Sequence, residues 1–399
     1  MLETVPTFPM PRAARCPFDP PPQLREVDDV SRVQIWNGDT PWLITGYDHL
    51  RTMLSDQRFS ADNRRDGYPH QSESVQSRRK TNRSFIAMDD PEHDRHRRML
   101  TRNFMIKRVA ALRPQVQRIV DELIDDMLAG PTSADLVTAL ALPVPSLVIC
   151  QLLGVPYADH DFFQACSKKL ISRETPVDEA VAASGELRSY LLDLIAAKQK
   201  SPTDDMIGGL VAGQLANGEL TVGEIADMSV LMLIAGHETT ANMIALGTLA
   251  LLEHPDQLAE LRDTDDPKLI ANAVEELLRY LSIVHGGRRR VATEDIEIGG
   301  RLIRAGEGVI LATDAANRDG AAFPDPDRLD IHREARHHVA FGYGVHQCLG
   351  QPLARMELQV VYGTLYRRIP TLRLAIPFED LRFKHDMIVY GVHSLPVSW

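Results

Sequence analysis

Apolar positions between residues 91 and 281 recur mostly at helical spacing, and short breaks rich in proline or glycine interrupt them. The breaks lie at Gly130-Pro131, Leu142–Pro145, Gly154–Pro156, Ser201-Pro202 and Asn217-Gly218. We therefore expect a mostly helical region from Pro91 to about Leu281.

An unusually long helix is predicted inside this region. Thr221 followed by Glu224 forms a capping box, and the next break is His254-Pro255. About 33 residues, each rising about 1.5 Å, span roughly 50 Å, which is enough to cross the whole molecule. Because the helix is apolar on nearly every side from Met228 to Ile234, we expect it to run through the core.

Short strands are predicted on both sides of the helical region. Residues 33–36 and 41–45 look like two strands joined across Asn37-Gly38-Asp39, which is a hairpin signal. After residue 281 we expect strands at 290–298, 301–303 and 309–313, a final helix at 351–368, and extended pieces and turns beyond it. The proline-rich residues 1–30 are expected to lie extended over the surface. The predicted fold class is mainly α with small β-sheets at one side, and nothing marks a linker that would divide residues 1–399 into domains.

The composition narrows the class of protein. Apolar residues make up 44% of the 399 residues and charged residues 25%, as in soluble globular proteins. The net charge of −11 argues against nucleic acid as a partner. The N-terminus has neither a positive start nor an apolar run, and the longest apolar stretch, 230–250, is interrupted by His237, Glu238 and Asn242. We expect a cytoplasmic protein without a membrane span.

Cys348 stands apart from the other cysteines, Cys16, Cys150 and Cys166, which are scattered and form no disulfide framework. The segment 341–350 reads FGYGVHQCLG, and its glycines let the backbone fold tightly and approach a flat ligand. The predicted helix 351–368 begins directly after it, so amide N–H groups and the positive helix end would favour a thiolate. A thiolate on haem iron promotes O–O cleavage. An incidental cysteine in a glycine-rich loop is the alternative.

A second motif, Ala235–Thr240 (AGHETT), lies in the middle of the long helix. Small residues at Ala235 and Gly236 leave room for a ligand against the helix. A buried acid and hydroxyl, Glu238 and Thr239, would be costly there without partners, and together they could relay protons. A purely structural acid–hydroxyl pair is the alternative.

Two further motifs carry charge at helical spacing. Glu276 and Arg279 lie on one helical face, which alone is a weak signal. His93 and Arg97 are one helical turn apart, so both can point at a single anionic group. A solvated basic face is the alternative for the arginines. Zinc is a further alternative, because the set His337, His338, His346 and Cys348 contains zinc-type ligands; their spacing matches no common structural zinc site.

These four separated motifs, in their order and spacing, resemble the cytochrome P-450 family of haem-thiolate monooxygenases, and the resemblance covers essentially the whole chain. It implies a single triangular, mainly helical fold, with haem b between the long helix and the loop of Cys348. The sulfur of Cys348 would bind the iron.

The resemblance assigns a role to each matched residue. Thr239 would hydrogen-bond the bound dioxygen, and Glu238 would help to deliver protons. Glu276 and Arg279 would lock to Arg328 as a structural set, although Leu329 stands where the family usually has phenylalanine. The cofactor-binding residues would be Cys348, His346, His93, Arg97, Arg290, Ala235, Gly236, Phe341, Gly342 and Gly350, with His93, Arg97, Arg290 and His346 on the haem propionates.

The polar segment between Phe59 and Phe85 matches the family's mobile flap over the pocket. Its composition predicts a solvated lid, and we consider His70 as a ligand that swings in to the resting iron. A solvated loop histidine is the alternative. The residues expected to line the substrate pocket are mostly apolar: Leu231, Met232, Ala235, Thr239, Ile283, Val284, Ile388 and Val389.

The expected reaction inserts one oxygen atom from O2 into a C–H bond of a bulky hydrophobic small molecule, such as a macrolide, a polyene or a secosteroid. Electrons would come from NAD(P)H through a ferredoxin reductase and a ferredoxin, because the chain has no flavin or iron–sulfur segment. The basic residues expected to face an acidic ferredoxin are Arg95, Arg98, Arg102, Arg336 and Arg355. Oxidative coupling, desaturation or epoxidation stays open as an alternative reaction. A haem-binding sensor or carrier is the alternative from another class, but a carrier needs no proton relay.

Overall fold

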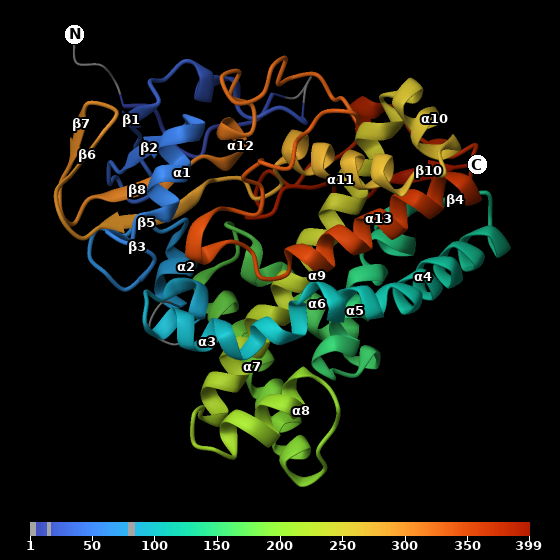
Figure 1. The fold of residues 1–399 in the computed structure, drawn as a ribbon, viewed down its shortest axis with the longest axis horizontal. Helices are drawn as coiled ribbons and strands as arrows, with labels where there is room; N and C mark the ends of the chain where they lie inside the picture. Colours follow the sequence, from blue (N-terminus) through green and yellow to red (C-terminus); the bar gives the residue numbers. More distant parts are fainter. Residues whose placement is uncertain (1–4, 14–16, 79–83) are drawn as a thin grey trace.

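The computed structural model describes residues 5–13, 17–78 and 84–399, and its outline is triangular, with α8 at one corner (Figure 1). The α-helices are α1 (Tyr47–Ser55), α2 (Glu73–Ser77), α3 (Glu92–Thr101), α4 (Ile106–Ala129), α5 (Pro143–Leu153), α6 (His160–Ile171), α7 (Val177–Lys200), α8 (Met206–Leu210), α9 (Val222–Leu252), α10 (Pro255–Asp263), α11 (Pro267–Leu281), α12 (Thr313–Ala316) and α13 (Gln351–Arg368). The helical region 91–281 and the final helix 351–368 are confirmed. Across the described ranges, no helix is long and apolar enough to cross a membrane.

The strands are short and gather mostly on one side of the molecule (Figure 1). They are β1 (Val30–Arg32), β2 (Trp42–Ile44), β3 (Phe59–Ser60), β4 (Ser133–Asp135), β5 (Arg288–Ala292), β6 (Ile296–Ile298), β7 (Arg301–Ile303), β8 (Gly308–Leu311), β9 (Arg373–Leu374) and β10 (Pro396–Ser398). The largest sheet has the order β1-β2-β8-β5-β3, in which β2 and β8 are parallel and the other neighbours are antiparallel. The smaller sheets are β4-β10-β9 and β6-β7. The predicted fold class, mainly α with small β-sheets, is confirmed.

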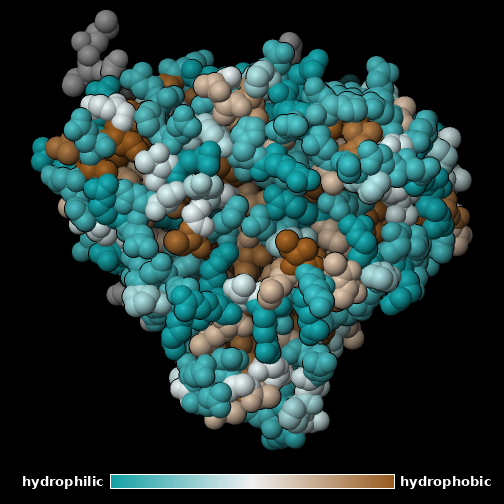
Figure 2. All heavy atoms as spheres, viewed as in Figure 1, coloured by the Kyte–Doolittle hydropathy of each residue, from teal (hydrophilic) through white to brown (hydrophobic). Residues whose placement is uncertain are grey.

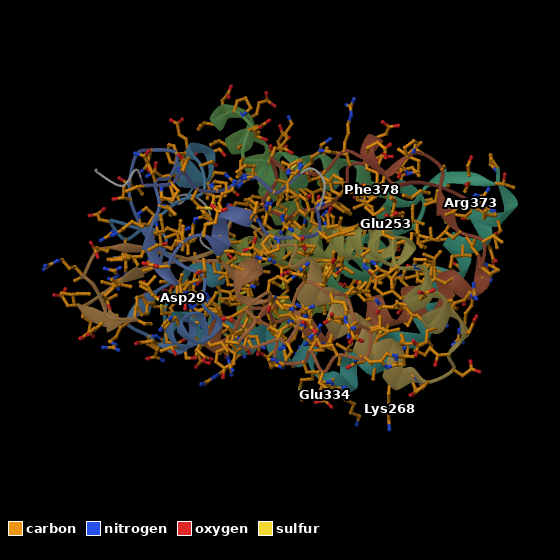
Figure 3. The ribbon with its side chains drawn as sticks, turned by 90° about the horizontal axis from the view of Figure 1, so that it is seen from above. Asp29, Glu253, Lys268, Glu334, Arg373 and Phe378 are labelled. Carbon is orange, nitrogen blue, oxygen red and sulfur yellow. The ribbon has the colours of Figure 1, made fainter. Side chains whose placement is uncertain are left out.

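Helix α9 runs through the middle of the molecule, as its apolar sequence predicted. Its first turn carries the capping box: the N–H of Glu224 donates to Thr221 Oγ1 (3.2 Å), and the N–H of Thr221 donates to Glu224 Oε2 (2.8 Å). Helices α5, α7 and α13 pack against it. From above, Glu253 just beyond its end lies among the other helices, between Asp29 on the strand side and Arg373 of β9 (Figure 3). The helix therefore carries its central residues into the interior.

The strands after residue 281 differ in their bounds from the prediction. The strand expected at 290–298 is two strands, β5 and β6, because the turn Thr293–Asp295 is exposed and polar and ends the ladder. Strand β5 begins earlier than expected, at Arg288, and pairs with β8 along most of its length. Strand β8 ends at Leu311, since Thr313 already starts α12. The correction places three consecutive arginines on a central strand of the largest sheet.

The N-terminal part also differs from the prediction. The segment 1–30 was expected over the surface, but Phe8, Met10 and Leu24 are buried in a small core beside the largest sheet, and Phe18 joins the main core. Backbone hydrogen bonds with residue 34 hold the segment against the sheet. The turn at 37–39 connects antiparallel strands as predicted, but the first of them, β1, lies three residues earlier than expected.

A buried ion pair joins Glu276 and Arg279 on α11. Arg279 Nε donates to Glu276 Oε2 (2.7 Å), and both side chains are fully buried. The Nη1 of Arg279 also donates to the carbonyl oxygens of Asn317 and Pro326, at 2.8 Å each. The pair therefore fixes α11 to the segment that leads towards the Cys348 loop.

The third residue of this set is Arg333, which corrects the prediction of Arg328. The side chain of Arg328 is 69% exposed and pairs with Asp330 on the surface (2.7 Å). Arg333 is instead folded back, and its Nε donates to Glu276 Oε1 (3.2 Å) with only 11% of the side chain exposed. Arg328 contributes its backbone carbonyl, which Arg279 Nη2 reaches at 3.4 Å. The surface acid next to Arg328 explains why its side chain stays outside.

Replacing Glu276 by Gln is expected to lower the free energy of unfolding by about 3–5 kcal/mol, because it leaves Arg279 buried without its counter-charge. The matched control Arg328→Gln, which removes an exposed ion pair, is expected to change it by less than about 1 kcal/mol. Urea unfolding followed by circular dichroism measures both. An Arg328→Gln variant as unstable as Glu276→Gln would show that Arg328 belongs to the buried set.

Candidate functional site

One face of α9 borders open space although the helix lies in the core. Ala235, near its middle, is exposed, and Leu231 and Thr239, one turn before and after it, are partly exposed. Residues four apart lie on the same face of a helix, so the three form one stripe. Thr239 Oγ1 donates to Ala235 O (2.9 Å), which holds the hydroxyl against the helix at this stripe. The stripe is a candidate wall of a ligand site.

Gly236 faces in another direction. A Cβ added to Gly236 would lie 2.5 Å from Cγ1 of Ile149 on α5, so a larger residue would separate the two helices. The sequence predicted that Gly236 makes room for the cofactor. In the structure, the absence of a side chain at Gly236 instead allows α5 to pack closely against α9.

Glu238 lies next to the stripe in a buried polar network. His237 is fully buried, and its Nε2 lies 3.7 Å from Glu238 Oε1. Asn242 Nδ2 donates to the carbonyl oxygen of Glu238 (2.7 Å), and Asn242 Oδ1 accepts from Lys384 Nζ (3.0 Å). Burial lowers the pKa of Lys384, and the charge of Glu238 acts in the opposite direction. Sequence reasoning missed Lys384, because no local pattern connects the C-terminal segment with α9.

The loop before α13 is held in a tight path. Gly342 and Gly344 have φ angles of 74° and 71°, which side chains other than glycine rarely adopt. The N–H of Cys348 donates to the carbonyl oxygen of Phe341 (2.9 Å). The guanidinium carbon of Arg355 lies 4.6 Å from the centre of the Phe341 ring. In Figure 1 this loop crosses in front of the middle of the molecule and continues into α13.

Positive groups gather around the sulfur of Cys348. Burial raises the pKa of this thiol, but Arg288, the Gly350 amide, Arg97 and Arg355 all lower it. A sulfur that faces several cations and a helix-end amide is suited to bear charge as a ligand. The other described cysteines, Cys150 and Cys166, are buried, and burial raises the pKa of both, so they stay thiols. Cys16 lies outside the described residues.

A basic cluster lies beside this loop. The rings of His93 on α3 and His346 are 4.0 Å apart between centroids. Arg97 Nη2 donates to the carbonyl oxygen of Gln347 (2.7 Å). Burial lowers the pKa of His346 to about 2, and Arg290, His93, Arg97 and Arg288 act in the same direction. The four residues expected on the haem propionates, His93, Arg97, Arg290 and His346, are thus brought together.

The cluster is incomplete without an acceptor. Nε2 of His93, Nδ1 of His346 and Nε of Arg288 are buried and have no hydrogen-bond partner in the part of the chain that the structure describes. Burial, together with the neighbouring charge of Arg290, lowers the pKa of Arg288 to about 10 against the opposing effect of Cys348, so its charge is costly where it stands. Buried donors of this kind fit the carboxylates of haem. Arg288 was missing from the predicted set, although strand alternation places it on the same face as Arg290.

A zinc site is not supported by this geometry. Among residues 5–13, 17–78 and 84–399, no three or more His, Cys, Asp or Glu side chains are placed to hold a metal ion. His338 is turned away from Cys348: its Nε2 lies 3.2 Å from Glu275 Oε2. His337 stacks on Phe323, with ring centroids 4.3 Å apart.

The predicted pocket residues outside α9 come from two segments that lie side by side. Val284 and Val389 form an isolated β-bridge. The carbonyl oxygen of Ile283 accepts from the N–H of residue 390 (2.7 Å), and the N–H of Ile388 donates to the carbonyl oxygen of Ile171 at the end of α6 (2.8 Å). Met232, by contrast, is only 8% exposed and belongs to the main core.

The flap differs from the solvated lid that the sequence predicted. His70 is only 3% exposed, and the ring centroids of Tyr68 and His70 are 5.1 Å apart. The indole Nε1 of Trp36 donates to the carbonyl oxygen of His70 (2.9 Å). These contacts pack the part of the segment around His70 against the rest of the protein, while residues 64–67 are exposed. Arg79, Lys80 and Arg83 lie outside the described residues.

Comparison with known proteins decides the family. The family model described as cytochrome P450 matches residues 33–369 of this chain, which is most of its length. The chain belongs to the cytochrome P450 family. It is therefore a haem-iron monooxygenase, and membership of the family implies dioxygen and redox partners as well.

Two curated relatives and a solved structure show how close this cytochrome P450 is to others. Cytochrome P450 GfsF of Streptomyces halstedii is 54% identical over 402 residues, which covers 100% of this chain and 97% of that protein. The vitamin D3 dihydroxylase of Streptomyces griseolus is 48% identical over 398 residues, which covers 99% of this chain and 97% of that protein. The structure of the mycinamicin VIII C21 methyl hydroxylase MycCI of Micromonospora griseorubida, bound to mycinamicin VIII, is 42% identical with a TM-score of 0.93, and covers 99% of this chain and 100% of that chain.

Gly236→Ala is expected to lower the free energy of unfolding by about 1–3 kcal/mol, because the new methyl group overpacks the contact with Ile149. Gly185→Ala, at a helical glycine on α7 with nothing within 4 Å of the added Cβ, is the matched control. It is expected to raise the free energy of unfolding by about 0.5–1 kcal/mol. Denaturant unfolding of both variants checks the pair, and equal effects would contradict the packing role of Gly236.

Proposed function

We propose that this cytochrome P450 hydroxylates a bulky hydrophobic small molecule, with Cys348 as the ligand of the haem iron. The observation that carries the proposal is the basic cluster beside Cys348, whose buried donors lack acceptors in the described structure. A haem provides two carboxylates for these donors and an iron for the sulfur. No other group implied by the family would satisfy both the buried donors and the sulfur of Cys348.

Haem b would be held by the residues around the loop. Cys348 would bind the iron through its sulfur, while His93, Arg97, Arg290 and His346 would bind the propionates. Arg288 adds a donor on the same strand face, and Phe341, Gly342 and Gly350 would contact the flat face of the cofactor. When bound, haem supplies the activation of dioxygen for insertion of an oxygen atom into a C–H bond.

Thr239 and Glu238 would hold and move protons at the stripe on α9. The hydroxyl of Thr239 donates to Ala235 O, so its oxygen is free to accept a hydrogen bond from the site. Glu238 is 7% exposed, and its carboxylate Oε1 lies 3.7 Å from Nε2 of the buried His237. Its backbone carbonyl oxygen accepts from Asn242, which also contacts Lys384. A non-catalytic haem sensor or carrier needs neither group, which favours an enzyme that consumes protons. Coupling, desaturation or epoxidation would use the same groups, and product analysis distinguishes these reactions.

The substrate class is inferred from the relatives and from the pocket residues. One relative is named for vitamin D3 and one structure holds mycinamicin VIII, so a secosteroid, a macrolide or a polyene is the class that we propose. The segments around Ile283, Val284, Ile388 and Val389 offer apolar side chains for such a molecule. We also propose that the chain is a single domain, because one continuous main core includes residues from Phe18 to Val397.

Electrons would come from NAD(P)H through a ferredoxin reductase and a ferredoxin. The face with the Cys348 loop is mainly hydrophilic, with small apolar areas near its centre (Figure 2). Arg98, Arg102 and Arg336 are exposed. Arg95 and Arg355 are in ion pairs with glutamates, at 3.1 and 2.6 Å. Arg98 is also paired, with Asp94 on the same helix at 2.5 Å. The attraction of an acidic ferredoxin would therefore depend mainly on Arg102 and Arg336.

Cys348→His is expected to abolish the red-shifted Soret band that a thiolate-ligated haem shows when the reduced protein binds carbon monoxide. The cause is the exchange of a sulfur ligand for a nitrogen ligand. Cys150→Ala, which removes a buried thiol away from the site, is the matched control and should keep the band. The proposal fails if Cys348→Ala retains an unchanged spectrum.

Thr239→Ala is expected to reduce product formation by about 10²–10⁴-fold and to divert electrons to hydrogen peroxide, because a positioned hydroxyl of the proton relay is lost. Substrate binding should change little, since only a hydroxyl and a methyl group are removed. Thr239→Ser retains the hydroxyl and should keep most of the product yield per NAD(P)H. A wild-type yield in Thr239→Ala would exclude this role.

A further inference from the structure

Strand β5 presents its three arginines to two different surroundings. Arg288 and Arg290 both lower the pKa of His346, so they lie on the side of the cofactor cluster. Tyr68 acts on both Arg289 and Arg290, whereas Arg173 acts on Arg289 alone among the three. Successive side chains of a strand point to opposite faces, which explains the difference. Arg289 is thus separate from the residues proposed to hold the haem propionates.

Arg289 and Arg173 meet at one turn of the backbone. Arg289 Nη1 donates to the carbonyl oxygen of Gly287 (3.3 Å). Nη1 of Arg173 is the nearest heavy atom, at 3.8 Å, to the position of a Cβ on Gly286. Both glycines have positive φ angles, 82° and 73°. The turn brings the two guanidinium groups to the same short stretch of backbone, and the charge of Arg173 lowers the pKa of Arg289.

Neither charge has an acid at close range, although Asp386 and Glu174 stabilise the charge of Arg173 from farther away. For Arg173 and Arg289, no carboxylate oxygen of a described residue lies within 4.0 Å of a guanidinium nitrogen, whereas surface arginines such as Arg64 have one at 2.6 Å. Arg289 is 6% exposed, and its buried Nε has no hydrogen-bond partner within the described ranges. Arg173 donates only to carbonyl oxygens of His385 and Asp386. A buried cation beside a half-buried one is stabilised when an anion lies between them.

The turn adjoins the segments proposed to line the substrate pocket. It follows Val284, which bridges to Val389. The N–H of Arg173 donates to the carbonyl oxygen of Asp386 (2.8 Å), two residues before Ile388. His285 Nε2 lies 2.6 Å from the carbonyl oxygen of Met387, so the same two segments are tied together next to the arginines. An anion at this turn would therefore be in contact with apolar pocket walls.

We propose that Arg173 and Arg289 bind a carboxylate of the substrate, so that the hydrophobic molecule taken by this enzyme is an acid. The proposal rests on the function proposed above and specifies its substrate class. A carboxylate suits the site because a guanidinium group can donate two parallel hydrogen bonds to its oxygens. A single negative charge on an apolar body also matches a site that joins two arginines to aliphatic side chains. The carboxylate would fix which end of the substrate lies near the stripe on α9.

The experiment compares acids with their uncharged esters on the haem-loaded protein. The probes are dodecanoic acid with methyl dodecanoate, and abietic acid with methyl abietate. Dissociation constants come from the Soret shift and, independently, from isothermal titration calorimetry. For at least one pair the acid is expected to bind about 10-fold or more tightly than its ester, the size expected for a buried charge-assisted hydrogen bond.

Arg289→Gln and Arg173→Gln are expected to weaken binding of the acid about 10-fold and to leave the ester unchanged, so that the preference disappears. Arg173 is the less buried of the two, so its variant keeps the test valid if Arg289→Gln folds poorly. Arg382→Gln, an exposed arginine of the neighbouring C-terminal segment, is the matched control and should keep the preference. Arg289→Lys should recover part of it, because it restores the charge without the forked donors.

Three results would overturn the proposal: no acid that binds more tightly than its ester, a preference that survives in both Gln variants, or loss of haem from Arg289→Gln with an unchanged preference. The last result would assign Arg289 to a propionate instead. The carbon monoxide spectrum of the wild-type protein separates this failure from failure of the proposed function. A protein with the thiolate band and no acid preference would refute only the inference about the substrate.

Discussion

Buried positive charge without matching acids is the constraint on which the rest of this site depends. Burying a guanidinium group is expensive unless an anion approaches it, so the backbone must hold these groups in place. Arg288–Arg290 lie on β5, which has β8 on one side and β3 on the other, and it cannot move without breaking the largest sheet. Arg97 and His93 lie on α3, away from the sheet. A strand and a helix thus hold the buried charges in place, and an anionic cofactor would offset the free-energy cost of burying them.

Helix α9 has to be a core element and a site wall at once. Its stripe of Leu231, Ala235 and Thr239 borders open space, while Gly236 lets Ile149 approach from α5. Further along, a Cβ on Gly391 would lie 1.8 Å from Oδ1 of Asn242, so the C-terminal segment also contacts this helix closely. Close packing on these sides keeps the helix rigid. A rigid helix is what allows one exposed stripe to keep a fixed position relative to a ligand.

The sequence predicted those features whose causes are local. The capping box of Thr221 and Glu224 marked the start of α9, and the glycines around Cys348 marked the tight loop, because each signal lies within a few residues of its effect. Arg333 could not be distinguished from Arg328 in this way, since the choice depends on whether Asp330 or the distant Glu276 is the nearer acid. Lys384 is separated from Asn242 by most of the C-terminal half of the chain. The N-terminal segment was misjudged because proline-rich composition does not reveal burial of Phe8 or Met10 against a sheet.

Arg355, one of the arginines expected to face a ferredoxin, has a structural role near Cys348 instead. Its Nε lies 2.6 Å from Glu275 Oε1, and its guanidinium carbon lies over the ring of Phe341. Burial alone would raise the pKa of Glu275, yet hydrogen bonds from His338 and Arg355 lower it to about 2. The carboxylate therefore stays charged and keeps Arg355 against the loop. An arginine used in this way supports the position of Phe341 and Cys348, and it leaves the attraction of an electron-transfer partner to Arg102 and Arg336.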